Sequence, residues 1–448
     1  AVLGVLGGRQ VASHPAVLRA VSPTYAVELF AELPWKAFLA LGSVFLVVTG
    51  GEALYTDMGH FGRRSIQLSW YALVLPGLLL NYFGQAAFLA DNADAFEHAG
   101  NPFYQMAPAW AVTPLAALAT CATVIASQAL ITGAFSLTVQ AVQLDYLPRL
   151  AIEHTSPQHI GQVYVPLVNW LLMLGCIALV ITFRSSSALA SAYGIAVTTT
   201  MLITTLIFYR VARDRWQWSA VRALAVLLPF LVVDAAFLAA NVPKIPSGGW
   251  LSLLVGLSLV VQMTTWRQGR ELVAARIRRG ERPMAEVAAE ALDAQVARVP
   301  GTAVYMFKDA GSAQPALIAN LRHNKVLHQT TLLVSVEVAD VPRVGHRKRA
   351  RHTRLGPGIY QVRLHFGFMD EPDVPAALAD VAIAGFEFDE HDVTYFVGRE
   401  SVTTGKAPGM PAWREELFVL LNRGAASASR FFRLPADRVF EVGTQVEI

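Results

Sequence analysis

The sequence predicts an α-helical integral membrane protein with a C-terminal α+β domain, and three observations lead to this fold class. Of 448 residues, 54% are hydrophobic and 15% are charged, whereas soluble domains carry about 25% charged residues. Residues 1–266 hold 23 of the charged residues and residues 267–448 hold 46. Several stretches longer than 20 residues contain no charge at all. We therefore predict a transmembrane region over 1–266 and a water-exposed domain over 267–448.

Composition also excludes several classes of protein. A net charge of +3 is too small to indicate a nucleic-acid partner. The two cysteines, Cys121 and Cys176, lie in apolar stretches and can build neither a disulfide framework nor a zinc cluster. The spans contain no His/Asp/Glu cluster with metal spacing and no activated Ser or Cys, so an enzyme is disfavoured and no cofactor is expected.

Seven segments are apolar and long enough to cross a bilayer, which takes about 20 residues. They are residues 36–58, 65–89, 109–144, 160–183, 185–209, 223–243 and 245–266. An odd number of spans puts the two ends of the region on opposite sides of the membrane. Arginines concentrate in the loops on the side of the C-terminal domain, for example at residues 210–222. The positive-inside rule then places that domain in the cytoplasm.

The C-terminal domain contains short β-like runs. These are TAVYMF, TTLLVSVEV, IYQVRLHFGF and VTYFVG. Gly356-Pro357-Gly358 predicts a turn between two of them. We interpret the basic run HRKRARHTR at 346–354 as a solvated loop, and contact with anionic lipid or a nucleotide is the alternative.

Glu52 is the strongest functional candidate among the ionisable groups at membrane depth. Such a group costs roughly 2.5–3.5 kcal/mol on insertion scales. Glu52 follows Thr49-Gly50-Gly51, and two adjacent glycines weaken a helix by about 1 kcal/mol each. A broken helix exposes carbonyls around a cavity, which is how many transporters bind ions. Glu52 could coordinate a cation or carry a proton there, and pairing with a neighbouring helix is the structural alternative.

Two aspartates and two neutral oxygens extend this candidate site. Asp57 precedes Arg63 and Arg64, so it is either an interface pair or a gate. Asp234 sits deep in its span, which favours a hydrogen-bonded or proton-relay role. Thr49 faces the break, and Tyr193-Gly194 interrupts another span, so their oxygens could complete a site for a monovalent cation.

The chain resembles the Kup (KUP/HAK/KT) family of potassium uptake transporters. The resemblance is carried by TGGEALYTDMGHFGRRSIQLSWYALVLPGLLLNYFGQAAFL, NPFYQMAPAW, ATVIASQALITGAFSLTVQAVQLDYLPRL, SSSALASAYGIAVTTTMLITTL and EVGTQVEI. It covers nearly the whole chain in collinear order. It implies twelve helices with the inverted-repeat, LeuT-like core of the amino-acid/polyamine/cation (APC) superfamily. It also implies proton-coupled potassium symport by alternating access in the bacterial inner (plasma) membrane.

The resemblance implies residue roles as well. Thr49 and Tyr193 would be potassium ligands, with Glu52 at the same K+ site and serving as the proton-coupling carboxylate. Asp234 would be a second proton-coupling group. The seven spans would be the sixth to twelfth family helices, and residues 1–7 the end of the fifth. The family's first five helices, with further site residues, would then be missing from this chain. The resemblance also permits a homodimer joined through the cytoplasmic domain.

A potassium channel and a symporter for another solute are the alternative functions. A potassium channel needs a filter such as TVGYG, and AYGIAV is a poor match. A symporter for another small cationic or organic solute on the same scaffold stays open. A carboxylate beside a broken helix suits a cation better than an anionic group, so potassium is preferred.

Overall fold

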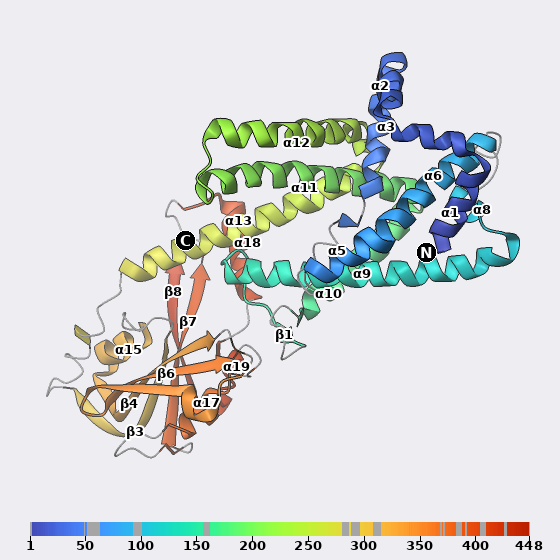
Figure 1. The fold of residues 1–448 in the computed structure, drawn as a ribbon. Helices are drawn as coiled ribbons and strands as arrows, with labels where there is room; N and C mark the ends of the chain where they lie inside the picture. Colours follow the sequence, from blue (N-terminus) through green and yellow to red (C-terminus); the bar gives the residue numbers. More distant parts are fainter. Residues whose placement is uncertain are drawn as a thin grey trace. The chain divides into compact units, whose positions relative to one another are not determined.

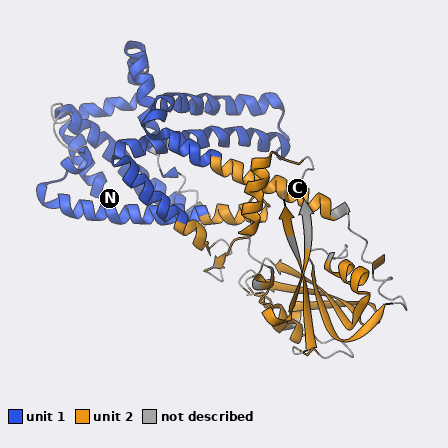
Figure 2. Cartoon of the chain, turned by 180° about the vertical axis from the view of Figure 1, so that it is seen from behind, with its two compact units in different colours: residues 1–134, 171–257 blue, residues 135–170, 258–448 orange. Residues whose placement is uncertain are grey.

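A computed structural model of the chain describes most of its 448 residues. The described residues are 2–48, 50–51, 63–92, 101–155, 162–279, 286–287, 296–307, 315–339, 341, 343–367, 370, 372–381, 388–389, 392–403, 409–424 and 428–447. They form two compact units (Figure 2). Unit 1 contains residues 1–134 and 171–257, and unit 2 contains residues 135–170 and 258–448. The boundary between a transmembrane region and a water-exposed domain at 266/267 stays a prediction.

The described part of unit 1 is built of helices (Figure 1). Its helices are α1 (Val2–Ser13), α2 (Pro23–Glu32), α3 (Pro34–Val44), α5 (Arg63–Ser69), α6 (Leu75–Asp91), α8 (Pro102–Gln105), α11 (Ser186–Asp214) and α12 (Ala220–Asn241). Short turns of 3-10 or π helix join or extend them: η1 (Pro15–Val21), η2 (Phe45–Val48), η3 (Trp70–Val74), η4 (Ala109–Ala111), η5 (Val242–Lys244) and η6 (Ile245–Gly249). Three further helices contribute residues to both units: α9 (Val112–Gln143), α10 (Pro166–Phe183) and α13 (Trp250–Arg279).

Five helical stretches among the described residues are long and apolar enough to cross a membrane. They are Arg64–Asp91, Ala109–Gln143, Pro166–Phe183, Ser186–Asp214 and Ala220–Ile277. The last one contains two of the predicted spans, which correspond to α12 and α13. The turns η5 and η6 join these helices without a gap, and the chain bends between them at Gly248, which has a φ of +148°. The predicted span at 36–58 is represented by a shorter apolar helix, Pro34–Val47, since residues 52–62 lie outside the described part.

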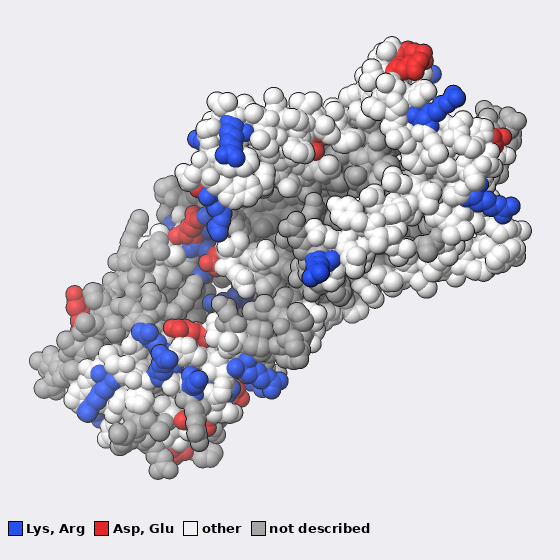
Figure 3. All heavy atoms as spheres, in the orientation of Figure 1, with Lys and Arg blue, Asp and Glu red and all other residues white. Residues whose placement is uncertain are grey.

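The apolar helices present their side chains outward rather than to a protein core. No residue of α10 is buried, although its sequence, PLVNWLLMLGCIALVITF, is almost entirely apolar. Figure 3 shows few charged side chains among the described residues of unit 1 on the face that it draws. An exposed apolar surface of this extent marks a membrane-facing or interaction surface, and hydrocarbon is the solvent that these helices match.

Helices α1 and α6 approach each other through glycines. A Cβ atom placed on Gly84 would lie 2.7 Å from the carbonyl oxygen of Gly7. A Cβ atom on Gly7 would lie 2.7 Å from the Cα atom of Asn81. Small residues allow such backbone approach between membrane helices, where van der Waals packing drives association.

Unit 2 joins the polar end of α13 to helix α18 (Ala412–Arg423). Trp266, Val273, Val402 and Phe418 form a small buried cluster, and the rings of Trp266 and Phe418 are 5.3 Å apart. Arg414 donates to the hydroxyl of Thr265 at 2.8 Å. The polar C-terminal part of α13 is therefore still helical, and it packs against other residues of unit 2.

A six-stranded sheet forms the centre of unit 2. Its strands are β3 (Ala297–Phe307), β4 (Val326–Ala339), β5 (Ala350–Gly356), β6 (Ile359–Gly367), β7 (Val393–Thr403) and β8 (Val439–Glu447), and a separate pair is formed by β1 (Glu153–His154) and β2 (Val163–Tyr164). The order in the sheet is β5-β6-β4-β3-β7-β8. All neighbours pair in parallel except β5 and β6. The four β-like runs of the sequence all fall on strands, so a C-terminal domain containing a sheet is confirmed.

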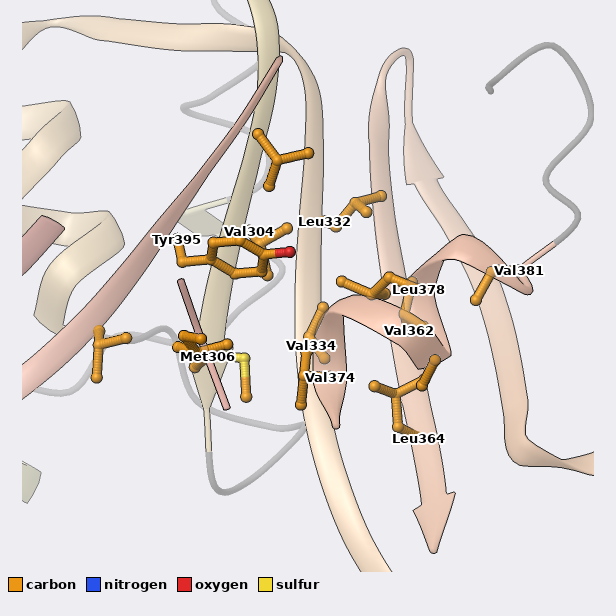
Figure 4. Packing of buried hydrophobic residues seen from close by; sticks show 14 of the residues in the cluster. Val304, Met306, Leu332, Val334, Val362, Leu364, Val374, Leu378, Val381 and Tyr395 are labelled. Carbon is orange, nitrogen blue, oxygen red and sulfur yellow. The ribbon is translucent and has the colours of Figure 1, made fainter. Parts of the chain in front are cut away.

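Both faces of the sheet are buried at its centre. Leu332 is 1% exposed and its neighbour Leu333 is 2% exposed, although successive residues of a strand point to opposite faces. Leu332 belongs to a cluster that includes α17 (Val374–Ala379) (Figure 4). Leu333 belongs to a second cluster that includes α15 (Pro315–Ala319). A near-continuous apolar run such as TTLLVSV is what a parallel strand covered on both faces requires.

The basic run at 346–354 is not a loop, so that interpretation is wrong. Residues His346–Arg349 form helix α16, and the rest of the run lies in β5, the edge strand paired antiparallel with β6. A turn is present at Pro357-Gly358, where Gly358 has a φ of +71°, but it joins β5 to β6, and β5 is not one of the four predicted runs. The positively charged side chains suit an edge strand, because charge on an exposed edge opposes further strand pairing.

The sheet gives one prediction about acid stability. Burial lowers the pKa of His328 on β4, and the carboxylate of Asp392 partly opposes this shift. Since the unfolded pKa is about 6.5 and the folded pKa is lower, this contribution to stability is present above about pH 6.5 and is lost as the pH falls. Amide hydrogen exchange of β3 and β4, corrected for intrinsic rates, should therefore be faster at pH 5 than at pH 7.5. The variant His328→Phe should lose this pH dependence; an unchanged dependence in the variant would contradict the prediction.

Candidate functional site

The structure describes two of the five predicted site residues. Tyr193 lies in α11 and Asp234 in α12. Thr49, Glu52 and Asp57 lie outside the described residues, so their predicted roles are addressed only as proposals below.

The helix that leads to Thr49 ends before it. Helix α3 ends at Val44, the chain continues as the 3-10 turn η2 to Val48, and Gly50 has a φ of +96°. A positive φ is easily adopted by glycine and is incompatible with a continuing α-helix. The interruption that the glycine pair predicted is therefore present.

Two carbonyl groups of this interrupted segment accept hydrogen bonds from distant side chains. The ammonium group of Lys244, in η5, donates to the carbonyl oxygen of Gly42. The phenol of Tyr82, in α6, donates to the carbonyl oxygen of Val47 at 3.2 Å. The last carbonyls of a helix have no partner within it, and here side chains from two other elements supply partners.

Tyr193 lies close to the same segment. Its ring stacks on Phe45 with centroids 6.4 Å apart and planes at 26°. Phe45 is 2% exposed, so this contact is inside the protein. The structure thus brings the predicted tyrosine of α11 next to the chain that leaves α3.

Asn241 closes this region from the end of α12. It is fully buried and donates through Nδ2 to the carbonyl oxygen of Phe237 at 2.9 Å. Its Oδ1 atom has no hydrogen-bond partner among the residues that the structure describes, and a Cβ atom on Gly194 would lie 2.7 Å from it. Only glycine fits at position 194 without displacing Asn241.

Asp234 has a different environment. It is 6% exposed and accepts a hydrogen bond from the hydroxyl of Thr205, in α11, at 2.6 Å. The ion pairs among the described residues include none to Asp234. Asp234 precedes Asn241 by seven residues, or roughly 10 Å along a helix axis. The structure therefore does not bring Asp234 and Tyr193 together in one site.

Sequence reasoning missed three residues of this region. None of Lys244, Thr205 and Asn241 is singled out from the sequence. The polar residue that ends the apolar run LAAN and the lysine three residues later were the available signals. Neither signal indicates which residue is contacted, because Gly42 and Gly194 lie on other helices.

Two family models match the chain. A model described as "K+ potassium transporter integral membrane domain" matches residues 1–271. A model described as "K+ potassium transporter C-terminal domain" matches residues 300–448.

Curated relatives match along the full chain. A "Probable potassium transport system protein Kup" of Anaeromyxobacter dehalogenans is 47% identical, with 100% of this chain and 67% of the relative covered. Proteins of the same description from Paramagnetospirillum magneticum (Kup 1) and Azoarcus sp. are each 48% identical over 100% of this chain, which spans 69% and 70% of their lengths.

The apolar helices and these matches define a multi-pass integral membrane transporter and not an enzyme. Within that class, the chain belongs to the K+ potassium transporter (Kup) family.

Proposed function

We propose that this protein takes up potassium as a proton-coupled symporter that works by alternating access. Potassium transport is supported by the family models and by the names of the relatives. The observation that carries the site is the interruption after α3, which lies against Tyr193. In transporters, carbonyls freed at such breaks coordinate the transported cation. Thr49, Tyr193 and Glu52 are the proposed K+ contacts, and K+ and H+ are substrates rather than cofactors.

Proton coupling is proposed for Glu52 and Asp234. Asp234 supports this part of the proposal because it is buried and hydrogen-bonded to a neutral hydroxyl. Carboxylates inside the membrane mark proton relays in pumps and transporters, and this is the role proposed for Asp234. Asp57 is proposed as a gate or interface residue near Arg63.

The remaining features of the proposal follow the family resemblance and the charge pattern. They are a LeuT-like inverted-repeat core, a plasma-membrane location and a cytoplasmic C-terminal domain. The basic loop residues support this orientation. A homodimer joined through that domain stays a prediction.

The test is Rb+ uptake by the protein expressed from its complete gene in cells without their own potassium uptake systems. Uptake should be faster at pH 5.5 than at pH 7.5. Glu52→Gln should reduce uptake at least about tenfold, equal to about 1.4 kcal/mol of barrier. Uptake that responds neither to pH nor to this substitution would rule out the symport mechanism.

A symporter for another small cationic or organic solute is the alternative function. Competition distinguishes the two, because K+ should displace Rb+ at equal concentration, whereas organic cations and amino acids should not. Inhibition by one of these organic solutes, and not by K+, would favour the alternative.

A further inference from the structure

Lys244 connects two helices that are remote in sequence. Its ammonium group donates to the carbonyl oxygen of Gly42, 202 residues away. The hydroxyl of Ser43 lies 3.4 Å from the same nitrogen. Among the described residues, no carboxylate lies within ion-pair distance of Lys244. Its cationic head is therefore directed at the end of α3.

Close backbone packing fixes this arrangement. A Cβ atom on Gly42 would lie 2.7 Å from the carbonyl oxygen of Ala240, near the end of α12. Lys244 follows Ala240 by four residues, through the short turn η5. The end of α3 and the end of α12 thus touch at Gly42, and Lys244 reaches the same glycine from the next turn of the chain.

The electrostatics of a helix end explain why a cation is placed there. The carbonyl end of a helix carries a partial charge of about −0.5. In transporters with broken helices, this end is where a free cation can be coordinated. At the carbonyl end of α3, the ammonium group of Lys244 occupies the position that a free cation would take.

We propose that Lys244 is a positioning residue for the ion site: its ammonium group neutralises the carbonyl end of α3 and holds this half-helix against α12. The contact keeps Phe45 and the chain leading to Thr49 in register with Tyr193. It also keeps the Gly42 carbonyl from binding the transported ion, so that the ion binds beyond the break. This inference rests on the proposed potassium transport.

The experiment measures Rb+ uptake kinetics of Lys244 variants in the protein expressed from its complete gene. Lys244→Gln should raise the KM for Rb+ at least about fivefold, the low end of couplings between two sites. Lys244→Arg keeps a cationic donor and should restore most of the affinity. Ser43→Ala is the matched control, because it removes a neighbouring polar group and leaves the Gly42 carbonyl paired.

A chemical rescue separates charge from folding. In a background with Cys121→Ser and Cys176→Ser, the variant Lys244→Cys is treated after membrane insertion with 2-aminoethyl methanethiosulfonate, which attaches an ammonium group. Methyl methanethiosulfonate attaches an uncharged group of similar chemistry. Only the first reagent should lower the KM toward that of the parent. Equal effects of the two reagents, or a wild-type KM in Lys244→Gln, would overturn the proposal.

Hydrogen exchange distinguishes failure of this inference from failure of the proposed function. If the parent protein shows no Rb+ uptake, the proposed function fails. The contact is then judged by the amides of α3, which should exchange faster in Lys244→Gln than in the parent or in Ser43→Ala. Unchanged exchange would overturn the positioning role.

Discussion

Replacing Asp234 by asparagine is expected to reduce Rb+ uptake at least about tenfold, equal to about 1.4 kcal/mol of barrier. Asparagine has the shape of aspartate and can still accept the hydrogen bond from Thr205, which is 2.6 Å away in the structure. It cannot take up and release a proton. Loss of uptake at an unchanged amount of protein in the membrane therefore identifies proton transfer, rather than packing, as the role of Asp234.

The Thr205 side of the pair supplies the control. Thr205→Val removes the hydroxyl that donates to the buried carboxyl group of Asp234. The loss of this hydrogen bond should lower the free energy of unfolding by about 1–3 kcal/mol. Thr205→Ser retains a hydroxyl and should transport like the parent. Normal pH-dependent uptake by Asp234→Asn would show that the hydrogen bond is structural and that proton coupling does not pass through α12.

The second large effect is expected at the contact between α1 and α6. Gly84→Ala should destabilise the protein by about 1–3 kcal/mol, the usual cost of overpacking, because the new methyl group would lie 2.7 Å from the carbonyl oxygen of Gly7. Backbone atoms cannot rotate away as a side chain can. The midpoint of thermal unfolding in detergent, measured by size-exclusion chromatography after heating, should be lower for Gly84→Ala than for the parent protein.

Gly77→Ala is the matched control on the same helix. Outside its own helix backbone, a Cβ atom at Gly77 has no neighbour within 4 Å in the described part of the chain, and alanine is favoured over glycine in a helix by about 1 kcal/mol. The control should therefore unfold at the parent temperature or above it. A Gly84→Ala variant as stable as Gly77→Ala would show that α1 and α6 do not approach as closely as their glycines indicate.

The helices of the membrane part were predictable because a hydrocarbon environment permits few kinds of backbone structure. Only long apolar segments satisfy their backbone hydrogen bonds within hydrocarbon, so charge-free runs such as 185–209 indicate helices directly. The interruption near Gly50 was also predictable, since two adjacent glycines weaken a helix locally. The sequence places the division between the last two spans at Lys244, four residues before Gly248, which has the positive φ in the turn between α12 and α13.

The C-terminal sheet was predictable in its strands and not in its pairing. TTLLVSVEV indicates a strand by itself, whereas its neighbours β3 and β6 depend on crossover connections that leave no local pattern. The basic run at 350–354 was misjudged for a related reason. Its strand exists because β6 pairs with it, with Thr353 opposite Gln361, and neither charge nor propensity reveals such a partner.

The sequence by itself determined the apolar helical stretches, the strands of the C-terminal domain and the break after α3, because each depends on composition or on neighbours along the chain. The tertiary structure alone decided that Lys244 meets Gly42, that Thr205 meets Asp234 and that Asn241 meets Gly194. These pairs join separate helices. Their distances are set by how closely the backbones pack at Gly42 and Gly194, and a linear sequence does not contain that geometry.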